Sequence, residues 1–388
     1  MRVLFLSQAE PSPSSGGGPR RTHQLWHELI ECFGLDNVVL APASEFVLPH
    51  KVPPGRLQKL LSTIGRNIVR RDKKKISLRF DNPRSVVVVE SYRRLVQSAS
   101  PDAVLVESAD VHYLAEINNE FGLKTVSAPW SIEALTNKLD HLITAFRSPV
   151  CDVELVDRVI HAFHHLAEDL VSGSKCERIW TLSRLECGFL KAAGLRCDYL
   201  PYYPVGDAEL YLERIRVQRR SRQGTFLICG GGITQNEVGL KNFLQQLKPT
   251  DMPSGAKIVI VGMRDLPVQW VSHLSCKVEF QGRLSDEDFC SLLSQSQAVL
   301  VPQNCGFGCA TRVADSLRAG VPVIADSIVG NGMGDIPGLT LVEDARGKWP
   351  AALHAAMTNS MDDFFESSSS WHLQQRAAAH DTIQKLCP

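Results

Sequence analysis

The sequence lacks the marks of a membrane protein, a metal protein or a nucleic-acid-binding protein. No apolar run approaches the length of a membrane span, and the opening run MRVLFLS is too short for a signal peptide. Eleven cysteines are present without a CxxC pair or cysteine–histidine spacing, which predicts reduced, mostly buried thiols and no metal site. The 42 basic residues balance 42 acidic ones, so the chain as a whole is not drawn to nucleic acid. We therefore expect a cytoplasmic protein.

What the sequence does contain is an alternation of apolar strands, glycine-rich loops and helices. Its length of 388 residues exceeds the size at which one hydrophobic core usually keeps growing, so two domains are expected. Each half begins with the same order of features. An apolar strand (2–7 or 225–229) is followed by three glycines (Gly16–Gly18 or Gly230–Gly232) and a helix. The sequence therefore predicts an α/β protein of two doubly wound, Rossmann-like domains that face each other across a cleft.

The domain boundaries follow from composition. Residues 1–205 are predicted as the first domain and residues 224–366 as the second. Residues 206–223 are rich in arginine and poor in apolar periodicity, which is typical of an interdomain linker. The stretch 367–388 opens with four serines, interpreted as a polar hinge, and continues as a helix that could reach back to the first domain.

The most informative stretch runs from residue 298 to residue 326 and reads AVLVPQNCGFGCATRVADSLRAGVPVIAD. It predicts a buried strand, a glycine turn at 306–308, a helix that ends at Gly320, and a second buried strand. In such a unit the helix start faces the carboxyl end of the first strand. Backbone N–H groups collect anions there, so the stretch predicts a ligand-binding crevice.

Two side chains on this helix sharpen the interpretation. Arg312 and Asp315 are three residues apart and share one helix face. A cation at this place can meet a phosphate, and a carboxylate one turn later can accept hydrogen bonds from a ribose diol. The alternative is an ordinary ion pair that binds nothing, since such pairs are common on helices.

In the first half, polar and basic side chains stand where a ligand-facing edge is expected. Arg21 and His23 follow the glycine loop, Glu107 ends a predicted strand, and Trp130 and Glu133 follow the next one. The carboxyl ends of parallel strands are where an open α/β sheet builds its site. A flexible loop without a ligand is the alternative interpretation of the glycines.

A basic segment, Lys51–Arg84, contains eleven Lys or Arg residues and two Asp residues. One interpretation is a surface helix that makes a peripheral membrane contact or meets an acidic partner. The other is a solvated, charged excursion from the first domain.

A family resemblance becomes visible once these motifs are placed in order. From about residue 224 to residue 326, the chain resembles the donor domain of a GT-B glycosyltransferase, and it is most similar to the retaining enzymes of glycosyltransferase family 4. The residues that carry the resemblance are Gly230, Asn236, Gly262, Gly282, Pro302, Gly306–Gly308, Arg312, Asp315 and Gly320–Val323.

The resemblance implies a nucleotide-sugar donor site opposite an acceptor domain. Arg312 would bind phosphate, Asp315 would stand where the family has a ribose-binding glutamate, and Lys241 would help to stabilise the leaving diphosphate. The implied donor-binding residues are Gly230, Gly231, Gly232, Asn236, Gly306, Phe307, Gly308, Cys309, Ala310 and Thr311. The implied acceptor-binding residues are Gly17, Gly18, Arg21, His23, Glu107, Trp130 and Glu133.

The implied reaction is sugar transfer with retained anomeric configuration to a small-molecule, glycan or lipid-linked acceptor. No DxD-type cluster is visible, which agrees with a metal-independent route and no cofactor besides the donor. Phe307 stands where the family often has the first of two glutamates, and the family's acceptor-side histidine has no clear counterpart. Two alternatives therefore stay open: a catalytically silent nucleotide-sugar-binding or regulatory protein, and a sugar-nucleotide epimerase. On this interpretation, Asp315→Ala removes nucleotide protection and leaves the nucleotide-free fold intact.

Overall fold

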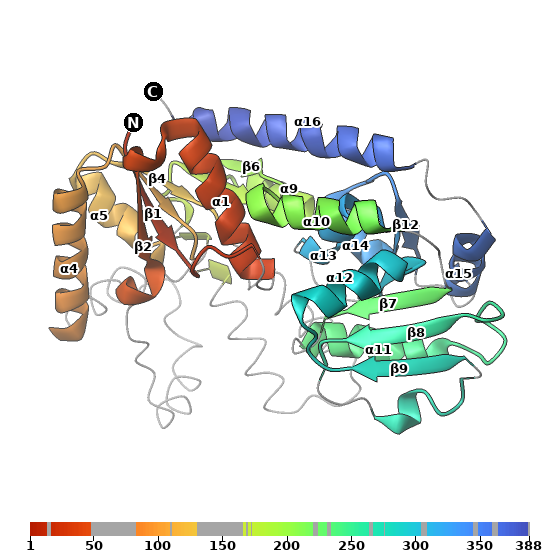
Figure 1. Cartoon of the computed structure of the whole chain (residues 1–388). Coiled ribbons are helices and arrows are strands. Elements are labelled where there is room, and N and C mark those ends of the chain that lie inside the picture. Colours follow the sequence, from red (N-terminus) through yellow and green to blue (C-terminus); the bar gives the residue numbers. More distant parts are fainter. Residues whose placement is uncertain are drawn as a thin grey trace, which may run out of the picture.

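The structure is a computed structural model, drawn in Figure 1. It describes residues 1–13, 17–47, 83–108, 111–129, 166–167, 170–171, 173–219, 224–230, 234–263, 267–274, 276–303, 309–343, 348–358 and 364–386. Among these residues, no helix is both long enough and apolar enough to cross a membrane.

The first half of the chain forms a six-stranded, fully parallel sheet in the order β2-β1-β3-β4-β5-β6. All five residues of β1 are buried, as expected for a parallel strand covered by helices on both faces. The direction of winding reverses between β1 and β3. The strands are β1 Val3–Ser7, β2 Val38–Pro42, β3 Ala103–Val106, β4 Lys124–Ser127, β5 Arg178–Thr181 and β6 Cys197–Tyr199.

The second half forms another six-stranded parallel sheet, in the order β12-β11-β10-β7-β8-β9. Its winding reverses between β7 and β10, and these are the strands that open the second half and the Ala298 stretch. The predicted fold class, two doubly wound α/β domains, is confirmed. The strands are β7 Thr225–Cys229, β8 Lys257–Val261, β9 Lys277–Gln281, β10 Ala298–Val301, β11 Val323–Asp326 and β12 Leu339–Val342.

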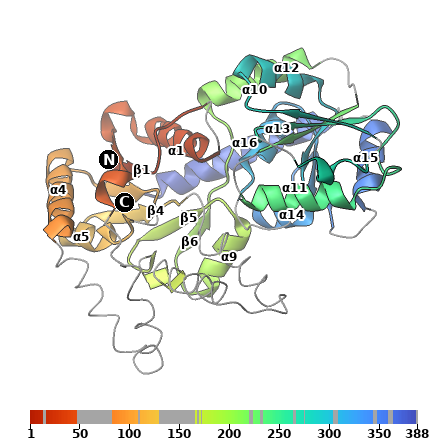
Figure 2. The same cartoon turned by 90° about the horizontal axis from the view of Figure 1, so that it is seen from below.

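Helices cover both sheets (Figures 1 and 2). Two of the helices have a serine N-cap. Ser183 Oγ accepts a hydrogen bond from the Glu186 N–H at the start of α9, and Ser285 Oγ accepts one from the Asp288 N–H at the start of α12. The helices are α1 Gly17–Phe33, α4 Pro83–Ala99, α5 Leu114–Glu120, α9 Arg184–Ala192, α10 Gly206–Gln218, α11 Thr234–Gln246, α12 Asp286–Gln295, α13 Thr311–Arg318, α14 Ser327–Met333, α15 Lys348–Thr358 and α16 Phe364–Gln384.

The arginine-rich stretch predicted as a linker contains a packed helix. Helix α10 contacts α12 and α13, and its Ala208, Leu212 and Ile215 are buried. These three residues stand at helical spacing, so one face of the helix is apolar although the stretch as a whole is rich in arginine. The described part of this connection, through residue 219, therefore contains a helix whose Leu212 and Ile215 pack in the same core as Val313 of α13.

Helix α16 runs along both halves of the molecule, as both views show (Figures 1 and 2). It contacts α13 of the second half and α1 of the first, and Ala379, Ile383 and Leu386 join the buried core around β1. The predicted serine hinge at residues 367–370 is wrong, because these residues lie inside the helix and Ser368 is buried. The last helix thus joins the two halves by burial of apolar surface.

His112 gives the fold a pH dependence. It is buried after β3, its Nε2 is hydrogen-bonded to Ser127 Oγ at the end of β4, and burial lowers its pKa to about 4. Because the unfolded value is 6.5, the stability contribution is complete above pH 6.5 and is lost as the pH falls through 4. We expect the loss to reach about 3 kcal/mol. In His112→Gln, urea unfolding should show a smaller change in stability between pH 7 and pH 4 than in the wild type, and parallel curves would contradict this assignment.

Candidate functional site

The two halves touch where α1 and α13 begin. A Cβ atom added at Gly17 would lie 2.6 Å from Thr311 Oγ1, so the first residues of the two helices are in direct contact. A larger residue at position 17 would require the Thr311 side chain to change its rotamer or the two helix starts to move apart. At this point the described residues leave no gap between the halves, although the sequence predicts a pyrophosphate between them.

Asp315 lies directly behind this contact. Arg20 of α1 forms a hydrogen-bonded ion pair with its Oδ2, although 295 positions separate the two residues in the sequence. Tyr202, which follows β6, donates its hydroxyl to Oδ1 at 2.8 Å. Asp315 is 6% exposed and Tyr202 is 1% exposed. The carboxylate predicted to hold a ribose is therefore bonded through both oxygens to the first half of the chain.

The electrostatics of this trio follow from burial. Removal from water raises the pKa of Asp315, and the Arg20 charge and the Tyr202 hydrogen bond oppose that rise. The pKa of Arg20 is raised, chiefly by Asp315. Burial and the nearby Asp315 charge both raise the pKa of Tyr202 well above its ordinary value, which keeps the hydroxyl protonated as a donor. In this conformation the Arg20 charge is the strongest of the influences that lower the Asp315 pKa against the effect of burial.

Arg312 lies on the same helix and points to the carboxyl ends of two strands. Its Nη1 donates to the Cys229 carbonyl oxygen at the end of β7 (3.2 Å), and its Nη2 donates to Gln303 Oε1 after β10 (3.0 Å). Burial lowers the pKa of its guanidinium. The cation therefore stands at the β7/β10 switch point, which is where open α/β sheets bind ligands.

Helix α11 approaches the same switch point through Gly239. A Cβ atom added there would clash with the Pro302 carbonyl oxygen, which is a backbone atom and cannot rotate away. We expect Gly239→Ala to displace α11 from the loop after β10 and to destabilise the protein by about 2 kcal/mol. Urea unfolding measures this loss. The control is Gly188→Ala on α9, where an added Cβ meets nothing within 4 Å, and an equal effect of the two changes would contradict the close approach.

The predicted acceptor residues of the first half are mostly engaged inside the protein. Glu107 is fully buried and accepts hydrogen bonds from the Thr22 hydroxyl (2.7 Å) and the Gln8 N–H (2.8 Å). It joins the chain after β1 to α1, so its carboxylate is used internally in this conformation. Arg21 is 1% exposed, donates to Gln24 Oε1 (2.6 Å), and has a pKa lowered to about 10 by burial.

The remaining predicted residues are distributed as follows. His23 is half-buried beside Gly206 at the start of α10, and burial lowers its pKa. Lys241 is exposed on α11, the helix that also contains Asn236. Gly18 lies in the first turn of α1, Gly230 directly follows β7 with φ +120°, and Cys309 and Ala310 precede α13. Burial raises the pKa of the Cys309 thiol to about 12.

Several predicted residues lie outside the described part of the chain. They are Gly231, Gly232, Gly306, Phe307, Gly308, Trp130 and Glu133, together with all of the basic segment Lys51–Arg84 except the first two residues of α4. Their predicted roles stay predictions.

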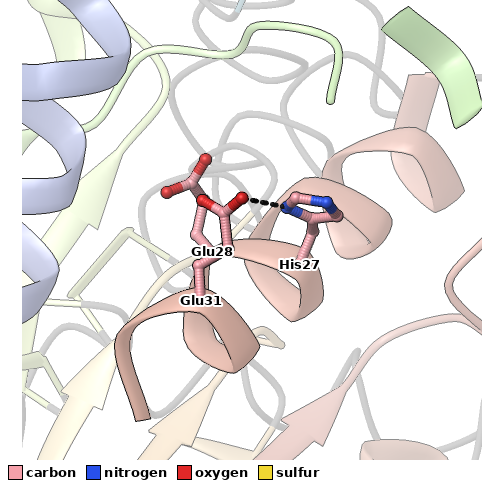
Figure 3. A group of neighbouring side chains, drawn as sticks. All are labelled: His27, Glu28 and Glu31. Carbon is pink, nitrogen blue, oxygen red and sulfur yellow. Dashed lines mark ion pairs between the residues drawn. The ribbon is translucent and has the colours of Figure 1, made fainter. Parts of the chain in front are cut away.

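A second polar cluster lies further along α1. His27, Glu28 and Glu31 bring ligand atoms within 4.8 Å of one another, a set that could hold a cation (Figure 3). Arg376 of α16 stands beside them, with Nη2 2.8 Å from Glu31 Oε1 and Nε 3.7 Å from Glu28 Oε1. Its guanidinium already supplies the positive charge that these carboxylates require. We therefore interpret the cluster as the ionic attachment of α16.

Two residues of the site are absent from the predicted sets of donor-binding and acceptor-binding residues. Arg20 stands next to Arg21 at the predicted helix start, and the sequence gives no reason to prefer one over the other. Helix geometry decides: Arg20 faces α13, whereas Arg21 faces the Pro201 carbonyl. Tyr202 carries no local signal, because its role depends on Asp315, which is 113 positions away.

Comparisons with known proteins agree with the fold of two doubly wound α/β domains. Residues 224–363 match the family model described as "Glycosyl transferases group 1". No curated protein sequence matches the chain significantly. Among solved structures, the chain is similar to sucrose-phosphate synthase from Thermosynechococcus elongatus, with 13% identity, a TM-score of 0.59, and coverage of 99% of this chain and 96% of that one.

Two further structures resemble the whole chain. Anabaena Alr3699/HepE in complex with UDP has 14% identity and a TM-score of 0.60, with 99% of both chains covered. The α,α-trehalose 6-phosphate synthase from Burkholderia multivorans has 10% identity and a TM-score of 0.60, with 99% of this chain and 96% of that chain covered. Identities this low show a shared fold, and that fold is the GT-B arrangement of two Rossmann-like domains. Membership of glycosyltransferase family 4 stays a prediction.

Proposed function

We propose that the protein is a glycosyltransferase that moves a sugar from a nucleotide diphosphate to an acceptor hydroxyl, with retention and without a metal ion. The observation that carries the proposal is the position of Arg312 and Asp315. Both lie on α13, directly after the β7/β10 switch point, inside the segment that matches the group 1 glycosyl transferase model. A cation and a carboxylate in this place suit the phosphate and the ribose of a donor.

The chemistry that these residues can supply is stabilisation of a leaving group. When the bond between the anomeric carbon and the diphosphate oxygen breaks, negative charge develops on that oxygen. Arg312 and the N–H groups at the start of α13 would lie near this charge, and fixed donors stabilise a developing anion without reorganising. The leaving oxygen can itself take the proton of an acceptor that attacks from the same face, so we assign no general base.

The donor can be identified by a binding screen. Because Anabaena HepE binds UDP and UDP-glucose, UDP-sugars are the first to test, followed by GDP- and ADP-sugars. We expect one class to raise the melting temperature and to be hydrolysed slowly without acceptor, equally well in EDTA. Proton NMR of the first-formed sugar should show the anomer of the donor. Absence of both binding and hydrolysis for all three classes would contradict the proposal.

A second candidate is a catalytically silent nucleotide-sugar-binding protein. The ion pair from Arg20 to Asp315 favours it, because this carboxylate is already occupied, and so does Phe307 in place of an acidic residue. Binding of a donor without any turnover would identify this function. An epimerised donor sugar among the products would identify the third function, a sugar-nucleotide epimerase.

A further inference from the structure

The contact between Arg20 and Asp315 bears directly on donor binding. Arg20 belongs to the first half of the chain and Asp315 to the second, so the pair spans the two halves. Arg20 contacts Oδ2 and Tyr202 contacts Oδ1, and the carboxylate is 6% exposed. A ribose that approaches Asp315 therefore finds both oxygens bonded and almost no open surface around them.

The two partners of Asp315 differ in how easily they can leave. Tyr202 is 1% exposed and packs in the core beneath α13, together with Leu212 and Val313. The Arg20 side chain is 20% exposed, and its Nε has no hydrogen-bond partner among the described residues. A long, flexible side chain near the surface can change rotamer without disturbing the core. Arg20 is therefore the partner that a ligand can displace.

We propose that Arg20 is an internal competitor of the nucleotide donor: its guanidinium occupies the Asp315 carboxylate that the ribose hydroxyls require, and a donor binds only after this contact between the halves has opened. The proposal rests on the proposed function, because it assigns Asp315 to the ribose. It follows that the open form is a fraction of the nucleotide-free protein. The apparent dissociation constant is raised in inverse proportion to that fraction.

The contact between the starts of α1 and α13 also opposes donor binding. Gly17 touches Thr311 in the conformation in which Arg20 holds Asp315. Space for a diphosphate between the two helix starts therefore requires the halves to separate at the same place. Release of Arg20 removes the charged contact that opposes this separation.

The test is a comparison of dissociation constants. Titration calorimetry would measure UDP, GDP and ADP binding to the full chain as wild type, as Arg20→Gln and as Arg20→Lys. Glutamine cannot pair with Asp315 as a cation, so we expect Arg20→Gln to bind the preferred nucleotide on the order of tenfold more tightly than the wild type. Lysine keeps the charge on a shorter side chain, and its effect should be smaller in the same direction. The matched control is Arg178→Gln, which removes a 2.8 Å ion pair to Asp198 elsewhere in the first half.

The outcomes separate this inference from the proposed function. Tighter binding by Arg20→Gln and unchanged binding by Arg178→Gln would support the competition, as would binding that appears only in the Arg20 variants. Equal or weaker binding by both Arg20 variants, with measurable binding by the wild type, would overturn the competition and leave the proposed function intact. If no nucleotide binds the wild type or any variant, the proposed function fails and this inference fails with it.

Discussion

Asp315→Ala is expected to weaken nucleotide binding on the order of a hundredfold, because a buried carboxylate that accepts two ribose hydroxyls contributes two charge-assisted hydrogen bonds. The same change should also destabilise the nucleotide-free protein, by about 3 kcal/mol, since the buried Tyr202 hydroxyl and the partly exposed Arg20 guanidinium both lose their partner. Thermal-shift titration and urea unfolding measure the two effects. The sequence alone led to a different expectation, an intact nucleotide-free fold, because it does not show these two partners.

A double variant separates the two effects of this substitution. Arg20→Leu combined with Asp315→Ala removes both charges, so no uncompensated cation is left between α1 and α13. Stability should then recover most of the loss seen in Asp315→Ala. Nucleotide binding should not recover, because the ribose still lacks its acceptor. If binding returns with stability, Asp315 acts through the fold and does not contact the donor.

The strand pattern of this chain could be predicted because parallel strands are buried on both faces. Val3–Ser7, Thr225–Cys229 and Ala298–Val301 are short apolar runs between polar loops, and each is a central strand of the structure. Arg312 could be predicted as a residue of the crevice for a related reason. A helix that follows a strand and a glycine turn must begin at the carboxyl edge of the sheet.

The partners of Asp315 could not be predicted, because they depend on how two separately folded sheets are brought together. Arg20 and Tyr202 stand 295 and 113 positions away, and local periodicity contains no information about such distances. Glu107 was predicted to face a ligand, but its partner also depends on the tertiary structure. A carboxylate at the end of a strand can face a ligand or a neighbouring loop, and here it accepts the Gln8 N–H. The apolar face of α10 was hard to predict for a local reason, since Arg214 and Arg216 flank the buried Ile215 and further arginines follow the helix.

The attachment of α16 by Arg376 leads to the second large expected effect. Glu28 is 1% exposed, and its pKa is raised by burial and lowered again by the Arg376 charge. Arg376 also pairs with Glu31, and it lies 3.9 Å from Glu209 of α10. One guanidinium therefore connects the last helix to two others (Figure 3 shows the acidic side of this cluster). Arg376→Leu keeps most of the apolar stem and removes the charge, so Glu28 is left as a buried carboxylate without its guanidinium partner, and His380 Nδ1, 3.7 Å from Glu28 Oε2, is the basic group that remains beside it.

The pH dependence of this loss tests its cause. A carboxyl group whose pKa is raised in the folded protein stabilises the fold when protonated, and that contribution disappears as the pH rises from 4.5 through the folded value. Without Arg376 the Glu28 pKa rises further. Arg376→Leu should therefore cost about 2 kcal/mol at pH 8, a value reduced from that of a fully buried pair because the Arg376 side chain is 35% exposed. The cost should be smaller at pH 5 than at pH 8, because the raised pKa brings Glu28 closer to its protonated form as the pH falls.

Urea unfolding of three variants at both pH values would decide between charge and packing. Gln374→Leu, an exposed position on the same helix, should change stability little at either pH. Glu28→Gln added to Arg376→Leu should remove the difference between pH 5 and pH 8, because glutamine has the shape of the acid and no charge to bury. If Arg376→Leu is equally destabilised at both pH values, α16 is held by its apolar contacts at Ala379 and Ile383, and the buried carboxylate is not what ties it to α1.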